Sequence, residues 1–79
     1  MSRALVLFVR ENCHLCEQFL LDFSLDFPET VATLRLCDVD ADPAQAAQYG
    51  LRVPVLLVAG RAVCEGSYDS EEVRSALAL

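Results

Sequence analysis

Basic residues are scarce in this sequence. Six arginines and no lysine stand against twelve acidic residues, which leaves a net charge of −6 at neutral pH. Nucleic acids and anionic membrane surfaces would repel such a chain, so we expect neither as a partner. No apolar run approaches the length of a membrane-spanning helix. Residues 1–9 lack the longer apolar run and the small-residue cleavage site of a signal peptide, so we expect a cytoplasmic protein.

Histidine is almost absent as well. His14 is the single histidine, which leaves little scope for general-base catalysis, and no Ser/His/Asp or paired-carboxylate arrangement stands out. Linkers, internal repeats and low-complexity segments are also missing. With 54% hydrophobic residues, the 79-residue chain can form one small packed domain, 1–79. We expect this domain to be a monomer.

The first half of the chain predicts a strand, a helix and a second strand. The continuous apolar run over 4–9 is typical of a central strand buried on both faces, and 31–39 predicts a second buried strand. Asn12 is a candidate N-cap for the helix between them, which should end near Asp26 because Pro28 follows. The apolar residues at helical spacing are Cys16, Phe19, Leu20, Phe23 and Phe27.

The second half predicts a short helix and a β-hairpin. Asp42 followed by proline is a strong start for a helix over 43–49, and Gly50 is a natural stop. Strands are expected over 55–59 and 62–64, joined by a tight turn at Gly60-Arg61.

A last helix should follow Asp69. With Glu72 three residues later, Asp69 fits a capping box. The apolar residues expected on its buried side are Val73, Ala76 and Leu77. The element order is therefore β-α-β-α-β-β-α. Right-handed crossovers favour an α/β fold with a mixed four-stranded sheet and helices on both faces.

Two of the four cysteines, Cys13 and Cys16, lie three residues apart where the first strand meets its helix. In a first helical turn, residues i and i+3 are neighbours, so these sulfurs can form or break a disulfide. The positive helix end stabilises a thiolate there. This pattern favours thiol–disulfide exchange. One alternative is that Cys13 and Cys16 serve only as small apolar residues. Another is a structural zinc site, but Cys37 and Cys64 are not spaced as a second ligand pair. We expect Cys37 and Cys64 to be packing residues.

Three separate segments resemble the glutaredoxins of the thioredoxin-fold superfamily, in particular the small bacterial glutaredoxin-like proteins. The segments are Cys13-His14-Leu15-Cys16, Val53-Pro54 and Gly66-Ser67-Tyr68-Asp69. The second is similar to the family's Val–cis-Pro step, and the third to the Gly-Gly-aromatic-Asp stretch through which glutaredoxins hold glutathione. Arg10 stands where the family usually carries a lysine.

The sequence departs from the family at three points. His14-Leu15 replaces proline followed by an aromatic residue, Arg52 replaces a threonine before Val–Pro, and Ser67 replaces a second glycine. These changes affect glutathione contacts more than the fold or the disulfide chemistry. We therefore expect weak glutathione recognition, aided by Arg10 and by the backbone N–H groups of 66–69.

The resemblance implies a thiol–disulfide oxidoreductase that reduces protein disulfides or glutathione mixed disulfides. Cys13, nearer the helix end and Arg10, would be the nucleophile, and Cys16, on the apolar stripe, the resolving cysteine. No tightly bound cofactor or metal is expected, and a reductase or the glutathione system would supply electrons. His14 either lowers the pKa of Cys13 or simply faces solvent.

Two further interpretations stay open. One is a redox-inert thioredoxin-fold domain used for binding or as a scaffold, and the other is an iron–sulfur carrier in which Cys13 and glutathione hold the cluster. The remaining acidic residues are interpreted as helix caps and solvated side chains. This interpretation applies to five aspartates among them, Asp22, Asp26, Asp38, Asp40 and Asp42.

Overall fold

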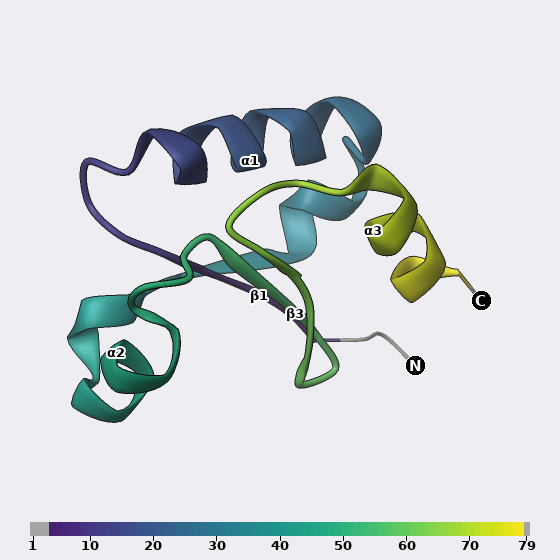
Figure 1. Ribbon diagram of the computed structural model, residues 1–79. Helices are drawn as coiled ribbons and strands as arrows, with labels where there is room; N and C mark the ends of the chain where they lie inside the picture. Colours follow the sequence, from purple (N-terminus) through teal and green to yellow (C-terminus); the bar gives the residue numbers. More distant parts are fainter. Residues whose placement is uncertain (1–3, 79) are drawn as a thin grey trace.

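The computed structural model describes residues 4–78 and contains one four-stranded sheet with three α-helices (Figure 1). Residues 1–3, which belong to the stretch considered above as a leader, and residue 79 lie outside the described residues. The strands are β1 (Leu5–Val9), β2 (Leu34–Asp38), β3 (Val55–Val58) and β4 (Arg61–Glu65). The helices are α1 (His14–Asp26), α2 (Pro43–Tyr49) and α3 (Ser70–Leu77), with 3-10 turns η1 (Thr30–Thr33) and η2 (Val39–Ala41).

The sheet has the strand order β2-β1-β3-β4. Strands β1 and β2 are parallel, whereas β3 is antiparallel to both β1 and β4. Helices α1 and α3 lie on one side of the sheet and α2 on the other (Figure 1). The predicted fold class and element order are confirmed.

The larger core lies under α1 and α3, and we call it the α1-side core. Its buried residues are Leu5, Leu7, Phe19, Phe23, Leu56, Val58, Cys64 and Val73. Phe19 and Phe23 come from the predicted apolar stripe, where Cys16 is also buried and Leu20 and Phe27 are half-buried. A helix with one apolar stripe must bury it against the sheet, and this contact places the start of α1 beside the end of β1.

The smaller core lies under α2, and we call it the α2-side core. Within residues 4–78, its buried members are Phe8, Val39 and Val55. Tyr49 stacks on Phe8 with ring centroids 4.9 Å apart. Alternation along β1 sends Phe8 to this face and Leu7 to the other, as the pleat of a strand requires.

The prediction that 31–39 forms a buried strand is wrong in two respects. Residues 30–33 form the 3-10 turn η1, and Val39 begins η2, so β2 covers only Leu34–Asp38. This strand is also largely exposed. The reason is its position at the edge of the sheet: among the strands of residues 4–78, β2 pairs with β1 alone and lies beyond the middle strands.

Two local predictions are displaced by a residue. Cys13, not Asn12, is the N-cap of α1, and Asn12 has a positive φ of 59° in the preceding loop, a conformation that asparagine tolerates. The hairpin turn consists of Ala59 and Gly60, both with positive φ, so Arg61 is already in β4. A two-residue turn with positive φ at both positions matches the twist of the paired strands.

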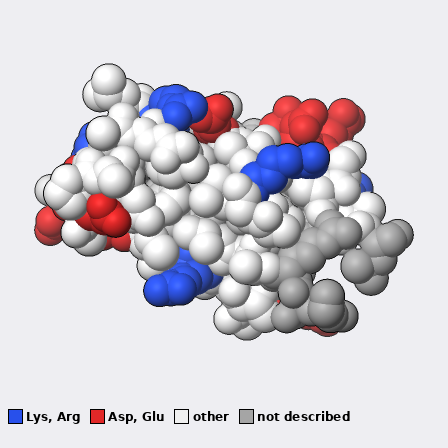
Figure 2. Space-filling model, turned by 90° about the horizontal axis from the view of Figure 1, so that it is seen from below, with Lys and Arg blue, Asp and Glu red and all other residues white. Residues whose placement is uncertain are grey.

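The surface carries dispersed charges. Seen from the side opposite α1, it is mostly uncharged, with Arg, Asp and Glu side chains in separate small groups (Figure 2). Several large apolar side chains are exposed, namely Leu15, Leu21, Leu25, Leu36 and Leu51. In the part of the chain that the structure describes, no helix is both long and apolar enough to cross a membrane.

Candidate active site

A disulfide joins Cys13 and Cys16 at the start of α1, with their Cα atoms 5.2 Å apart. The loop after β1 delivers Cys13 to the N-cap position, and one helical turn brings Cys16 beside it. The backbone N–H of Cys16 donates a hydrogen bond to Sγ of Cys13 at 3.2 Å. The Cys13 sulfur therefore occupies the place where a helix end stabilises an anion.

The two sulfur-bearing residues differ in exposure. Cys13 is half-buried, whereas Cys16 is only 4% exposed and lies on the apolar stripe of α1. A disulfide partner can therefore reach Cys13 more easily.

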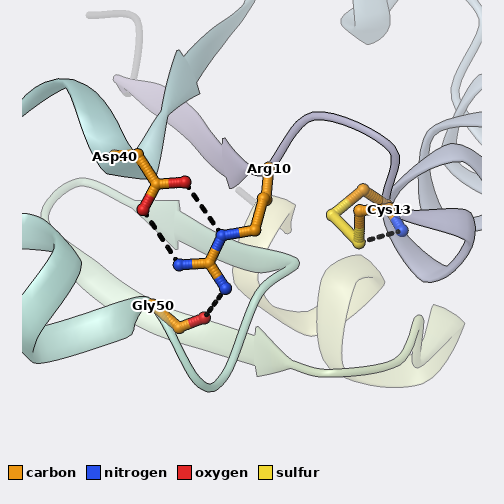
Figure 3. Close-up of a disulfide and its surroundings, with 5 residues drawn as sticks. Arg10, Cys13, Asp40 and Gly50 are labelled. Atoms are coloured by element: carbon orange, nitrogen blue, oxygen red, sulfur yellow. Dashed lines mark hydrogen bonds and ion pairs between the residues drawn. A yellow bond between two sulfur atoms is a disulfide. The ribbon is translucent and has the colours of Figure 1, made fainter.

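Arg10 lies three residues before Cys13, but its guanidinium is bound elsewhere (Figure 3). Its Nε and Nη2 atoms donate to the Asp40 carboxylate at 2.9 and 3.0 Å, and Nη1 donates to the Gly50 carbonyl at 2.8 Å. The hydrogen bond from Arg10 lowers the pKa of Asp40, and the same bond raises the pKa of Arg10. The charge of Arg10 is thus neutralised on the side away from the disulfide.

Gly50 permits this approach. A Cβ atom at this position would lie 3.0 Å from Nη2 of Arg10 and closer still to the Ala46 carbonyl oxygen. The sequence indicated Gly50 only as a helix stop and Asp40 only as a cap or solvated residue. Neither showed the contact with Arg10, because the partners lie 30 and 40 residues apart in the chain.

The Val53–Pro54 peptide bond is cis, as the resemblance of this segment to the family's Val–cis-Pro step implies. Phe8 pairs with Val55 in the antiparallel β1–β3 ladder, so Pro54 lies at the end of the sheet where β1 leads into the Cys13 loop. The Gly66 N–H donates to the Pro54 carbonyl at 2.8 Å. The second and third segments of the resemblance are therefore joined to each other at the end of the sheet that carries the disulfide.

The residues after Gly66 have mainly structural contacts. Ser67 is exposed. The Tyr68 hydroxyl donates to the Asp26 carboxylate at 2.7 Å, and its ring packs edge-on against Phe19. Burial, followed by this hydrogen bond, raises the pKa of Tyr68. Asp69 caps α3, since its carboxylate accepts the N–H groups of Glu71 and Glu72 at 3.1 Å each.

His14 and Leu15, between the two cysteines, are both exposed, with Leu15 at 60%. Arg52, which precedes Val53, is held by Glu65 at 2.6 Å and by the Gln48 carbonyl, and it lies over the Tyr49 ring. Leu15 and Arg52 stand at two of the three positions where the sequence departs from the family pattern, and their side chains differ in how firmly they are held. Leu15 faces solvent, whereas Arg52 is fixed against α2 and β4.

A groove of about 360 Å³ opens beside the disulfide, on the side of β2. Both cysteines line it, and β2 contributes Leu36, which the sequence did not indicate as a site residue. Its full lining is Val9, Arg10, Asn12, Cys13, Cys16, Glu17, Leu20 and Leu36. No local signal identified Leu36, because its exposure depends on β2 being an edge strand.

The remaining cysteines lie in different cores. Cys64 is buried in the α1-side core, where burial raises the pKa of its thiol, and Cys37 is half-buried against the α2-side core. They therefore face opposite sides of the sheet and cannot pair with each other. Among residues 4–78, no group of three or more His, Cys, Asp or Glu side chains is placed to hold a metal ion.

Comparison with known proteins agrees with this geometry. The family model of the Glutaredoxin-like domain (DUF836) matches residues 4–78. The chain is similar to protein Ne2328 from Nitrosomonas europaea, solved by NMR, with 28% identity, a TM-score of 0.83 and coverage of 99% of this chain and 94% of that chain. It is also similar to protein XcR50 from X. campestris, solved by X-ray crystallography, with 32% identity, a TM-score of 0.71 and coverage of 94% and 95%. No curated protein matches. The chain belongs to the glutaredoxin-like domain family and has the thioredoxin-like fold of that group.

Proposed function

We propose that this protein is a thiol–disulfide oxidoreductase that uses Cys13 as nucleophile and Cys16 as resolving cysteine. The observation that carries the proposal is the Cys13–Cys16 disulfide at the N-terminus of α1, with the Cys13 sulfur in the N-cap position. A structural role is a weaker account of this pair, because the bond closes a loop of only a few residues and adds little constraint to the unfolded chain.

The reaction is a two-electron exchange between two dithiol/disulfide pairs. In the reduced protein, the Cys13 thiolate attacks one sulfur of the substrate disulfide and forms a mixed disulfide, and the first substrate thiolate leaves and takes up a proton. Cys16 then loses its proton and attacks Sγ of Cys13. The second substrate thiol is released, and the protein is left oxidised as the Cys13–Cys16 disulfide.

Position along the helix supports these roles. The Cys16 N–H already donates to the Cys13 sulfur, and the same bond would stabilise a thiolate there. Cys16 is buried, which keeps it protonated until the mixed disulfide forms beside it. Because Arg10 is bound to Asp40 and Gly50, the helix end contributes more to the activation of Cys13 than Arg10 does.

Protein disulfides are the proposed substrates, and glutathione is proposed as a reductant with weak recognition. Tyr68 and Asp69 are used to hold Asp26 and to cap α3, and Ser67 adds a side chain where close backbone approach would help. We further propose a cytoplasmic monomer that receives electrons from glutathione or from a reductase. A coupled assay with each donor separately identifies which one serves.

A thiol count tests the proposal directly. Mild oxidant should remove two of the four thiols reversibly, and intact mass with peptide mapping should show the loss at Cys13 and Cys16. Cys37→Ser is the matched control and should leave this count of two unchanged. If no thiols disappear reversibly, the protein is a redox-inert binding or scaffold domain; visible absorption after anaerobic purification would instead indicate an iron–sulfur carrier.

Single-cysteine variants test the division of roles. Cys13→Ser should abolish disulfide reduction, whereas Cys16→Ser should react once and accumulate a mixed disulfide with substrate, visible by intact mass. Iodoacetamide at neutral pH should label Cys13 faster than Cys16 in the reduced protein. Faster labelling of Cys16 would reverse the assignment.

A further inference from the structure

We propose that the groove between α1 and β2 binds an extended segment of the protein whose disulfide is reduced. The segment would place a bulky apolar residue beside its cysteine and a basic residue close to Glu17. This inference rests on the proposed function, because it names the substrate class of the same disulfide.

The groove leads directly to the two sulfurs and has apolar walls. Cys13 and Cys16 form one end, Leu20 on α1 is half-buried, and Leu36 on β2 is 52% exposed. An apolar side chain entering here would remove both leucines from water while its neighbouring cysteine lies at the disulfide. We therefore expect Leu36 to contact a bulky apolar residue of the substrate next to the substrate cysteine.

The strand that carries Leu36 can also hold an extended backbone. β2 is at the edge of the sheet and pairs with β1 alone among the described strands, so its outer row of backbone N–H and C=O groups has no strand partner. Extended peptides bind such edges through main-chain hydrogen bonds, with side chains selecting the sequence. A folded protein surface or a small, compact ligand would not form these main-chain hydrogen bonds with the edge of β2.

The charge around the groove favours a basic segment. Glu17 is the acidic residue of the groove lining, and its side chain is exposed. Asp38, two residues beyond Leu36 on β2, lies outside the lining, and its carboxylate accepts the Asp40 N–H at 2.9 Å. Arg10, the cation among the described residues of the lining, is neutralised by its two hydrogen bonds to Asp40. The net charge of the groove lining is therefore negative. A negative lining attracts lysine or arginine and disfavours glutathione, a tripeptide with two carboxylates.

The test compares two disulfide substrates in single turnovers of the pre-reduced, full-length protein. The first is a disulfide-linked dimer of an eight-residue peptide whose cysteine is flanked by leucine and arginine, and the second is hydroxyethyl disulfide. The measured quantity is the ratio of their second-order rate constants, so that changes in thiol chemistry cancel. Peptides with serine in place of leucine, or glutamate in place of arginine, probe the two parts of the proposal.

Leu36→Ser should lower the ratio about tenfold, as expected for the loss of one apolar contact, and Leu36→Met should restore it. Glu17→Gln should lower it about threefold, and only for the peptide that carries arginine. The matched control is Leu25→Ser, also on an exposed leucine (72%) but at the far end of α1, which should leave the ratio unchanged.

The outcomes separate this inference from the proposed function. If both substrates are reduced but the ratio is the same in wild type and Leu36→Ser, the groove does not bind the segment and the oxidoreductase proposal still stands. If the reduced protein transfers electrons to neither substrate, the proposed function fails and this inference fails with it.

Discussion

The two faces of the sheet are built in different ways. The α1-side core buries eight side chains, including two phenylalanines from one helix, whereas the α2-side core buries three. On the α2 side, hydrogen bonds and ion pairs connect the elements. Arg10 bonds to Asp40 and Gly50, Asp42 caps α2, and Arg52 bonds to Glu65.

We infer that the two faces have different roles: the α1 side mainly stabilises the fold, and the α2 side mainly positions the loop that leads to Cys13. Apolar burial is the main favourable term in folding, so we expect the α1-side core, with its larger set of buried side chains, to contribute more to stability than the α2-side core. The polar contacts on the α2 side are exposed and individually weak, but they are directional. They connect the loop that leads to Cys13 with η2 and with the end of α2. Four variants, two on each face, test whether apolar packing and polar contacts are divided between the faces in this way.

Phe23→Ala should have the largest effect. Phe23 is fully buried in the α1-side core, so its truncation removes a large apolar side chain and leaves a cavity, at a cost of about 4 kcal/mol in the free energy of unfolding. Urea denaturation of the reduced protein measures this change. Leu25→Ala, on the exposed side of the same helix, is the control and should stay within about 0.5 kcal/mol of wild type.

Val39→Ala should cost less, although Val39 is also fully buried. Two methyl groups are removed from the smaller core, and the expected loss is about 2 kcal/mol. Amide exchange should rise first in η2 and α2 and only later in α1. A loss as large as that of Phe23→Ala would show that the two faces contribute equally.

Tyr68→Phe tests a polar contact on the α1 side. Loss of the hydrogen bond to Asp26 should cost about 1 kcal/mol at neutral pH. Because the folded protein raises the pKa of Tyr68, the stabilisation is present below the pKa of an unfolded tyrosine, about 10, and is lost as the pH rises above it. The difference between wild type and Tyr68→Phe should therefore shrink above that pH.

Asp40→Asn should have the smallest effect, a modest fall in thermal stability at neutral pH. Since the folded protein lowers the pKa of Asp40, its stabilisation is present above the ordinary aspartate pKa, about 3.9, and is lost as the pH falls through the lower folded value. The difference from wild type should close in acid and also narrow in high salt. If the difference in thermal stability between wild type and Asp40→Asn stays constant from neutral pH into acid, the effect is due to packing and not to the charge of Asp40.

Features encoded within a few residues were predictable from the sequence. Asp42 caps α2 through the Ala44 N–H, Asp69 caps α3, and the stripe on α1 buries Phe19 and Phe23, because each depends on spacing along one segment. The Cys13–Cys16 pair was found for the same reason. The N-cap of α1 was missed by one residue, since a cysteine sulfur took the role expected of Asn12.

Features that depend on tertiary position were not predictable. The pattern of β2 is apolar enough for a central strand, and only the strand order shows that Leu36 faces solvent beside the disulfide. The contact of Arg10 with Asp40 and Gly50 joins segments 30 and 40 residues apart, so the sequence could place Arg10 near Cys13 but could not show which anion binds it.

The sulfur cap of α1 has a consequence for how activity could be lost. Serine is among the best N-cap residues, and its hydroxyl oxygen can accept the same Cys16 N–H that the Cys13 sulfur accepts now. Exchanging one sulfur for one oxygen at position 13 would therefore remove the thiol while leaving the helix start intact. For the proposed oxidoreductase, this single conservative substitution would give a folded domain without redox chemistry.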